Sequence, residues 1–184
     1  MSYKLSVIIP VFNAEDYIKE CLDSVVDQSL GIDNIEVIIV NDNSCDSTLD
    51  IISQYTDKYP SFKLISNKSN LGPGESRNMA LKEVSSDYVT YLDADDFISQ
   101  NAYEDALSKI NEFNADLLIY NWETYTGSDY VEPINIHQQN TLENKLITDI
   151  KQNPKLFLST APWNKIYHRS LFKYLKFSKG FYED

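Results

Sequence analysis

The stretch "YVTYLDADDF", residues 88 to 97, joins an apolar strand to a group of acidic side chains. Three carboxylates, Asp93, Asp95 and Asp96, occupy four positions at the point where a buried strand should reach the surface. Like charges this close together are unfavourable unless a cation neutralises them or one carboxylate binds a proton. The stretch therefore predicts a strand that ends at a charged site on the edge of a sheet.

The three carboxylates are expected to differ in role. If the backbone stays extended, strand alternation sends the side chains of Asp93 and Asp95 to the same side. Such hard oxygen ligands suit Mg²⁺ or Mn²⁺, so this pair predicts a metal site. Asp96 is instead predicted to cap a helix that begins near Ser99.

The segments around this stretch alternate between two patterns. Continuous apolar runs rich in β-branched residues predict buried strands, and apolar residues at helical spacing predict amphipathic helices. The predicted strands cover residues 5–12, 35–40, 62–66, 88–92 and 116–122, and the predicted helices cover 14–29, 49–59, 79–84 and 103–113, with Asn13 as the first N-cap. Four alternations in about 120 residues predict an α/β fold with a mostly parallel sheet and helices on both faces.

Polar residues gather after four successive predicted strands. They are Asn13 and Glu15, then Asp42 and Ser44, then residues 70–77, and last the three aspartates. In parallel sheets, ligands bind outside the carboxyl ends of the strands. The sequence therefore predicts a binding site at this one edge.

The chain changes in character after Trp122. Residues 1–122 form the alternating part, whereas residues 123–184 are more polar and weakly patterned, with helices expected near 142–152 and after Pro154. The chain ends abruptly at "KGFYED", which predicts that it is the front part of a longer protein.

Charge and composition exclude several classes of protein. A net charge of −12 in 184 residues argues against general nucleic acid binding, although a cation can bridge an acidic site to a phosphorylated small molecule. The sequence has no apolar stretch long enough to span a bilayer, and the N-terminus does not read as a signal peptide. Cys21 and Cys45 are predicted to be reduced thiols of a cytoplasmic protein.

Standard nucleotide and hydrolase motifs are missing. The stretch "GPGESRN", residues 72 to 78, is neither G-x-G-x-x-G nor a P-loop, and it is read either as a turn before a helix or as a loop whose Arg77 reaches a diphosphate. His137 and His168 are isolated, which argues against a zinc site. No serine stands in a G-x-S-x-G motif, which argues against a catalytic triad of the α/β-hydrolase type.

Several motifs, in order, resemble those of family 2 glycosyltransferases with the GT-A fold. They are "SVIIPVFNAEDYIKECLDSV", "VIIVNDNSCDST", "NLGPGESRNMAL" and "YVTYLDADD", followed by "PWNKIYHRSLF" and the terminal "FYED". The resemblance implies a Rossmann-like three-layer sandwich. It also implies transfer of a sugar from a nucleotide diphosphate donor to an acceptor hydroxyl, usually with inversion.

The resemblance implies roles for residues on the donor side. The base-binding stretch is resembled by Pro10, Phe12 and Glu15, and the carboxylate that accepts the uracil imide N–H is resembled by Asp42. The loop beside ribose and diphosphate is resembled by Asn70, Gly72 and Arg77. The D-x-D pair is resembled by Asp93 and Asp95. In that pair Asp95 ligates the metal and Asp93 contacts the ribose or the metal shell. Phe12 as a core aromatic and Asp42 as a turn residue remain open alternatives.

The resemblance also implies residues on the acceptor side. Asp184, within the terminal "ED", resembles the catalytic base, with a solvated acidic chain end as the alternative. Trp163, Asn164 and Lys165 resemble a segment that lines the acceptor side, and Trp163 could equally be a packing anchor.

The sequence thus predicts an inverting glycosyltransferase that uses a UDP-sugar and Mn²⁺ or Mg²⁺. The expected acceptor is a cell-surface glycan or polymer, and the expected location is the cytoplasm, with any contact to the inner face of the membrane made by a part after residue 184. A nucleotide-sugar binding module without turnover is the alternative. A nucleotidyltransferase is disfavoured, because "VFNAEDY" lacks a glycine-rich basic loop.

Overall fold

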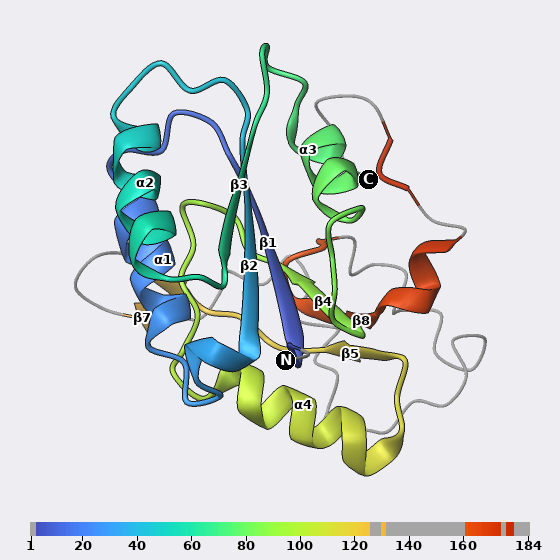
Figure 1. Ribbon diagram of the computed structural model, residues 1–184. Helices are drawn as coiled ribbons and strands as arrows, with labels where there is room; N and C mark the ends of the chain where they lie inside the picture. Colours follow the sequence, from blue (N-terminus) through green and yellow to red (C-terminus); the bar gives the residue numbers. More distant parts are fainter. Residues whose placement is uncertain (1–2, 126–129, 132–160, 174–175, 179–184) are drawn as a thin grey trace.

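The computed structural model describes residues 3–125, 130–131, 161–173 and 176–178 (Figure 1). The helices expected near 142–152 and after Pro154 lie outside these residues, and so does the terminal "FYED" motif. Within the described part, no helix is both long enough and apolar enough to cross a membrane. Cys21 and Cys45 are both free thiols, one buried and one exposed.

A six-stranded, mostly parallel sheet forms the centre of the fold. Its order is β3-β2-β1-β4-β8-β5, built from β1 (Leu5–Val11), β2 (Ile35–Asn41), β3 (Phe62–Ser66), β4 (Tyr88–Tyr91), β5 (Leu117–Ile119) and β8 (Lys165–His168). Strands β1 to β4 are parallel neighbours, whereas β8 runs antiparallel between β4 and β5. The sequence pattern did not predict β8, which brings a segment from the second part of the chain into the sheet of the first.

Helices cover both faces of this sheet, as Figure 1 shows. The described helices are α1 (Ile18–Val26), α2 (Thr48–Lys58), α3 (Pro73–Ala80) and α4 (Ala102–Phe113), with 3-10 turns η1 (Ile32–Asn34) and η5 (Arg169–Lys173) and a separate ribbon of β6 (Thr124–Tyr125) and β7 (Tyr130–Val131). Val7 and Ile9 of β1 pack in the cluster that contains α1, α2 and α4, while Ile8 packs in the cluster of α3. Strand alternation thus feeds two apolar layers, and the prediction of a three-layer α/β sandwich is confirmed.

The predicted cap of the first helix is wrong. Helix α1 begins at Ile18 rather than near residue 14, and Tyr17 precedes it without a side-chain cap. Asn13 has a positive φ of 48°, and its Oδ1 accepts a hydrogen bond from the backbone N–H of Cys45 at 2.9 Å. Asparagine tolerates this conformation better than most residues. Asn13 therefore forms a turn after β1 and connects it to the loop that contains Cys45.

The cap predicted for Asp96 is also wrong. Helix α4 begins at Ala102, with Asn101 before it, and Asp96 lies in a turn in which its N–H donates to the carbonyl of Asp93 at 3.1 Å. All three aspartates therefore stay together at the end of β4.

Candidate functional site

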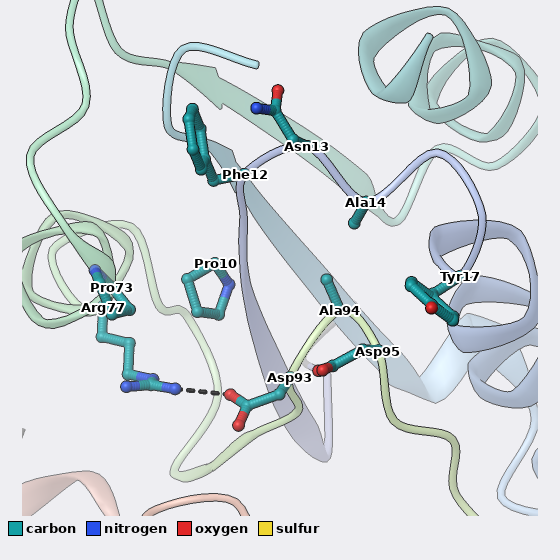
Figure 2. A pocket seen from close by; sticks show the side chains of 10 residues that line it. All are labelled: Pro10, Phe12, Asn13, Ala14, Tyr17, Pro73, Arg77, Asp93, Ala94 and Asp95. Carbon is teal, nitrogen blue, oxygen red and sulfur yellow. Dashed lines mark hydrogen bonds and ion pairs between the residues drawn. The ribbon is translucent and has the colours of Figure 1, made fainter. Parts of the chain in front are cut away.

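A pocket of about 450 Å³ opens where β1 and β4 end (Figure 2). Five of the residues predicted from the sequence line it: Pro10, Phe12, Arg77, Asp93 and Asp95. Its walls therefore come from three motifs that are far apart in the chain, as the position at the carboxyl edge predicts.

Both carboxylates of the D-x-D pair point into this pocket, as Figure 2 shows. Oδ1 of Asp93 forms an ion pair with Nη2 of Arg77 at 2.5 Å. Arg77 is only 2% exposed, whereas the side chain of Asp93 is 31% exposed. Asp95 is exposed, so the pair offers one carboxylate held by the protein and one that faces solvent.

The acidic cluster has more negative charge than its surroundings neutralise. Burial raises the pKa of Asp93, the Arg77 guanidinium partly opposes this change, and the charge of Asp95 adds to it. Partial burial of the carboxyl group, together with the charges of Asp93 and Asp95, raises the pKa of Asp96 to about 6. A bound cation would favour the ionised carboxylates, so the electrostatics suit a positively charged ligand.

Two aromatic rings enclose the buried guanidinium of Arg77. Its Cζ lies 5.8 Å from the ring centroid of Tyr91 and 5.6 Å from that of Phe177, within the range of cation–π contacts. The packing therefore buries the guanidinium, while the Asp93 carboxylate that it holds stays partly exposed in the pocket. The structure thus shows Arg77 acting on Asp93, and a direct contact with a diphosphate stays a prediction.

Asp42 holds the loop that precedes α3. It is 3% exposed, and its two oxygens accept hydrogen bonds from Asn67 Nδ2 at 2.7 Å and from the N–H groups of Leu71 and Gly72 at 2.9 and 2.8 Å. Asn70 supports the same turn, because its Oδ1 accepts from the Gly72 N–H at 3.1 Å. Asp42, Asn70 and Gly72 therefore shape the loop next to the pocket, and their predicted contacts with a nucleotide are untested.

Glu15 joins the loops that follow β1 and β2. Its Oε2 accepts from the N–H of Ser47 at 2.8 Å, while its own N–H donates to Asp46 Oδ2 at 3.2 Å. The N–H of Ala14 donates to Thr48 Oγ1 at 2.8 Å in the same way. Glu15 therefore has a structural role, which is to link the two loops. Its predicted contact with a nucleobase stays a prediction.

The predicted acceptor-side residues lie together around β8. Trp163 packs edge-on against Trp122 with 5.4 Å between ring centroids, and its carbonyl accepts from Tyr120 Oη at 2.6 Å. Lys165 is buried, and its Nζ donates to Asn164 Oδ1 at 2.8 Å and to the carbonyl of Ala161. Burial lowers the pKa of Lys165 to about 8.

Five lining residues were given no individual ligand-binding role from the sequence. They are Asn13, Ala14, Tyr17, Pro73 and Ala94. Asn13 and Pro73 belong to the polar segments predicted to border the site, and the other three lie within two positions of a predicted residue, so motif position was an available signal. Asp184, the predicted base, lies outside the described residues.

The comparisons with known proteins agree with this geometry. The family model described as glycosyl transferase family 2 matches residues 6–175. This chain belongs to that family. The prediction of the family from the sequence motifs is therefore confirmed.

Relatives include proteins of Gram-positive bacteria. The chain is 32% identical to "Glycosyltransferase GlyA" of Streptococcus pneumoniae, over 96% of this chain and 26% of that protein. It is 33% identical to "Poly(ribitol-phosphate) beta-N-acetylglucosaminyltransferase TarS" of Staphylococcus aureus, over 92% of this chain and 28% of that protein. The chain thus spans only about a quarter of the length of these relatives.

Solved structures show the same fold. The crystal structure of S. aureus TarS 1–349 superposes with a TM-score of 0.84 at 31% identity, covering 96% of this chain and 50% of that one. Structures of TarS 1–349 in complex with UDP and with UDP-GlcNAc give TM-scores of 0.80 and 0.77. A mannosyltransferase from Pyrobaculum calidifontis in complex with GDP-Man and Mn²⁺, at 22% identity and a TM-score of 0.57, supports the fold alone.

Proposed function

We propose that this chain is the donor-binding part of an inverting glycosyltransferase that uses a UDP-sugar and glycosylates a cell-surface polymer. The observation that carries the proposal is the pocket at the carboxyl edge, where Asp93 and Asp95 stand beside Arg77. The UDP and UDP-GlcNAc complexes of the relative TarS support the choice of donor. The names of relatives, a poly(ribitol-phosphate) beta-glucosyltransferase and TarS, support a teichoic acid type of polymer as acceptor.

The two carboxylates of the D-x-D pair fit a divalent cation as ligands. Asp95 supplies an exposed carboxylate and Asp93 supplies a second one from the other side of Ala94. Among the described residues no group of three metal-ligating side chains occurs. Mg²⁺ and Mn²⁺ sites on nucleotides commonly need only one or two carboxylates, because substrate phosphates and waters complete the shell. When bound, such an ion would neutralise the charge that develops on the leaving diphosphate.

The aromatic lining of the pocket suits a nucleoside. Phe12 is 49% exposed and Tyr17 is 56% exposed, so both rings offer accessible apolar surface in the pocket. A uracil ring can stack on such a face. Asp42 stands behind the loop, and the hydrogen bonds from Asn67, Leu71 and Gly72 already use about four acceptor sites of its carboxylate, so a bond from a uracil imide N–H would replace one of them.

The transfer step needs a base on the acceptor side. In the proposed reaction the acceptor hydroxyl oxygen bonds to the anomeric carbon while the bond from that carbon to the diphosphate oxygen breaks. The hydroxyl proton moves to the carboxylate of Asp184, a kind of assistance that typically contributes about 10²–10⁴-fold. The acceptor path would be lined by Trp163, Asn164 and Lys165. The proposal also includes a cytoplasmic location at the inner face of the membrane.

Calorimetric titration of the chain with UDP tests the proposal. Mn²⁺ is expected to tighten UDP binding at least about tenfold, since it bridges the carboxylates and the diphosphate. Asp95→Asn should remove this gain, whereas Asp57→Asn, at an exposed position of α2, should keep it. Equal UDP affinity with and without the metal would contradict the proposed metal site, and no UDP binding at all would contradict the donor.

A further inference from the structure

One side chain of α3 fastens a distant segment of the chain to the donor pocket. Asn78 Nδ2 donates to the carbonyl of Phe177 at 3.0 Å, and the N–H of Phe177 donates to Asn78 Oδ1 at 3.0 Å. The carboxamide therefore uses both of its polar groups on a single residue that stands 99 positions later. Such a paired contact fixes the direction of the backbone as well as its distance from the helix.

A glycine on the same helix allows the close approach. A Cβ atom at Gly74 would lie 2.8 Å from the carbonyl oxygen of Ser178 and 3.3 Å from Cβ of Phe177. Gly74 is buried in the first turn of α3, and the segment 176–178 occupies the space that a larger side chain would need.

The fastened segment covers the arginine of the pocket. The ring centroid of Phe177 lies 5.6 Å from Cζ of Arg77 and packs edge-on against Tyr91 with 5.2 Å between centroids. Arg77 in turn pairs with Asp93 in the pocket. A continuous series of contacts thus leads from Asn78 through Phe177 and Arg77 to the D-x-D carboxylate.

We propose that Asn78 and Gly74 are positioning residues that dock the segment 176–178 on α3 and thereby hold Arg77 against Asp93. The donor pocket then needs this segment in place before Asp93 is oriented for ligand binding. The inference rests on the proposed function only for the ligand, a nucleoside diphosphate with a divalent cation.

The inference gives four residues of the 72–78 motif separate tasks. Gly72 adopts a positive φ of 86° and begins α3. Gly74 admits the segment 176–178, Arg77 holds Asp93, and Asn78 fastens Phe177.

Limited trypsin digestion measures whether the segment is docked. Lys176 is exposed and directly precedes Phe177, so cleavage after it reports local opening of the segment. Asn78→Ala removes both hydrogen bonds to Phe177, together with a longer one from Asn78 Nδ2 to Glu75, and is expected to speed this cleavage about tenfold. Asn111→Ala, an equal change at an exposed position of α4, is the matched control and should cleave as the wild type does.

Gly74→Ala separates docking from ordinary helix stability. At an unobstructed helix position this change is stabilising, so cleavage would stay equal or become slower. Since the new Cβ would clash with Ser178, we expect faster cleavage after Lys176 instead. This variant also tests the inference without removing any hydrogen-bonding group. Circular dichroism of both variants checks that they are folded.

UDP titration in Mn²⁺ measures whether docking matters to the pocket. Asn78→Ala and Gly74→Ala are each expected to weaken UDP binding about tenfold, as is typical when a group that orients a metal ligand is lost. Faster cleavage with unchanged UDP affinity would overturn the coupling to the pocket, and unchanged cleavage in both variants would overturn the docking itself. Failure of the wild type to bind UDP would instead contradict the proposed function and leave the cleavage result as an independent test of docking.

Discussion

The two ends of the parallel strands, called here the amino edge and the carboxyl edge of the sheet, surround their carboxylates with opposite environments. At the amino edge, Glu36 of β2 is fully buried, and its oxygens accept from Ser6 Oγ at 2.5 Å, from Lys63 Nζ at 2.7 Å, and from both the N–H and Oγ of Ser85 at 2.9 Å. At the carboxyl edge, Asp93 has one ion pair, to Arg77, and lies near the second carboxylate of Asp95.

The difference appears in the pKa of each group. Burial acts to raise the pKa of Glu36, but the bonds from Lys63, Ser6 and Ser85 together lower it below its ordinary value of 4.5. Burial raises the pKa of Asp93 above 3.8 even though Arg77 opposes the change. A carboxylate that the fold satisfies is therefore part of the structure, and one that the fold leaves short of positive charge marks the ligand site.

The largest expected effect is on stability at the amino edge. Glu36→Ala leaves Ser6 and Ser85 without this acceptor and Lys63, whose side chain is 45% exposed, without its ion pair. It should lower the free energy of unfolding by about 1–3 kcal/mol, the usual cost of removing one partner from a buried hydrogen-bond network. Urea denaturation measures this loss, with Glu83→Ala at an exposed position as the control. UDP affinity of the folded variant should be unchanged. A loss below about 1 kcal/mol would show that the network is not a major source of stability.

A pH titration compares the two edges directly. Followed by the carboxyl carbon signals in NMR, Glu36 should titrate below 4.5 and Asp93 above 3.8. Glu36 binds fewer protons when folded, so its contribution to stability is lost as the pH falls through its folded pKa. Asp93 binds more protons when folded, so its contribution changes in the opposite direction and is lost as the pH rises. Shifts of the same sign would remove the contrast between the edges.

The smallest expected effect on stability is at Asp95. Its side chain is exposed, so Asp95→Asn should change the free energy of unfolding by no more than about 0.5 kcal/mol, while it removes the effect of Mn²⁺ on UDP binding. Urea denaturation and calorimetry on the same sample measure both quantities. A loss of stability comparable to that of Glu36→Ala would place Asp95 among the structural carboxylates.

The sequence predicted the elements whose cause is local. Continuous apolar runs and helical spacing identified β1 to β4, α1, α2 and α4, and the polar ends of these strands identified the edge that carries the pocket. The helix predicted over residues 79–84 was misplaced, because α3 spans Pro73–Ala80 and begins with a proline at its first position, where proline is tolerated. The helix caps were not predicted correctly. Asn13 hydrogen-bonds to Cys45 in a loop that is distant in the sequence, and Asp96 bonds within a local turn that hydrophobic periodicity does not indicate.

The missed features depend on contacts between distant segments. Strand β8 is only four residues long and sits between β4 and β5, so its burial comes from neighbours that a local pattern cannot show. The Arg77–Asp93 pair, the Glu36 network and the Asn78–Phe177 contact join residues 16, 27 to 49, and 99 positions apart. The motif resemblance selected Arg77 and Asp93 but gave no sign that one holds the other.

Crystals of the chain grown with UDP and MnCl₂ test the central claim most directly. Anomalous scattering at the manganese edge locates the ion without reference to the protein density. We expect one peak within coordination distance of Asp95, with Asp93 in the same shell and the UDP diphosphate on its open side. A bound UDP whose diphosphate lies away from these carboxylates, with no manganese peak beside them, would contradict the account.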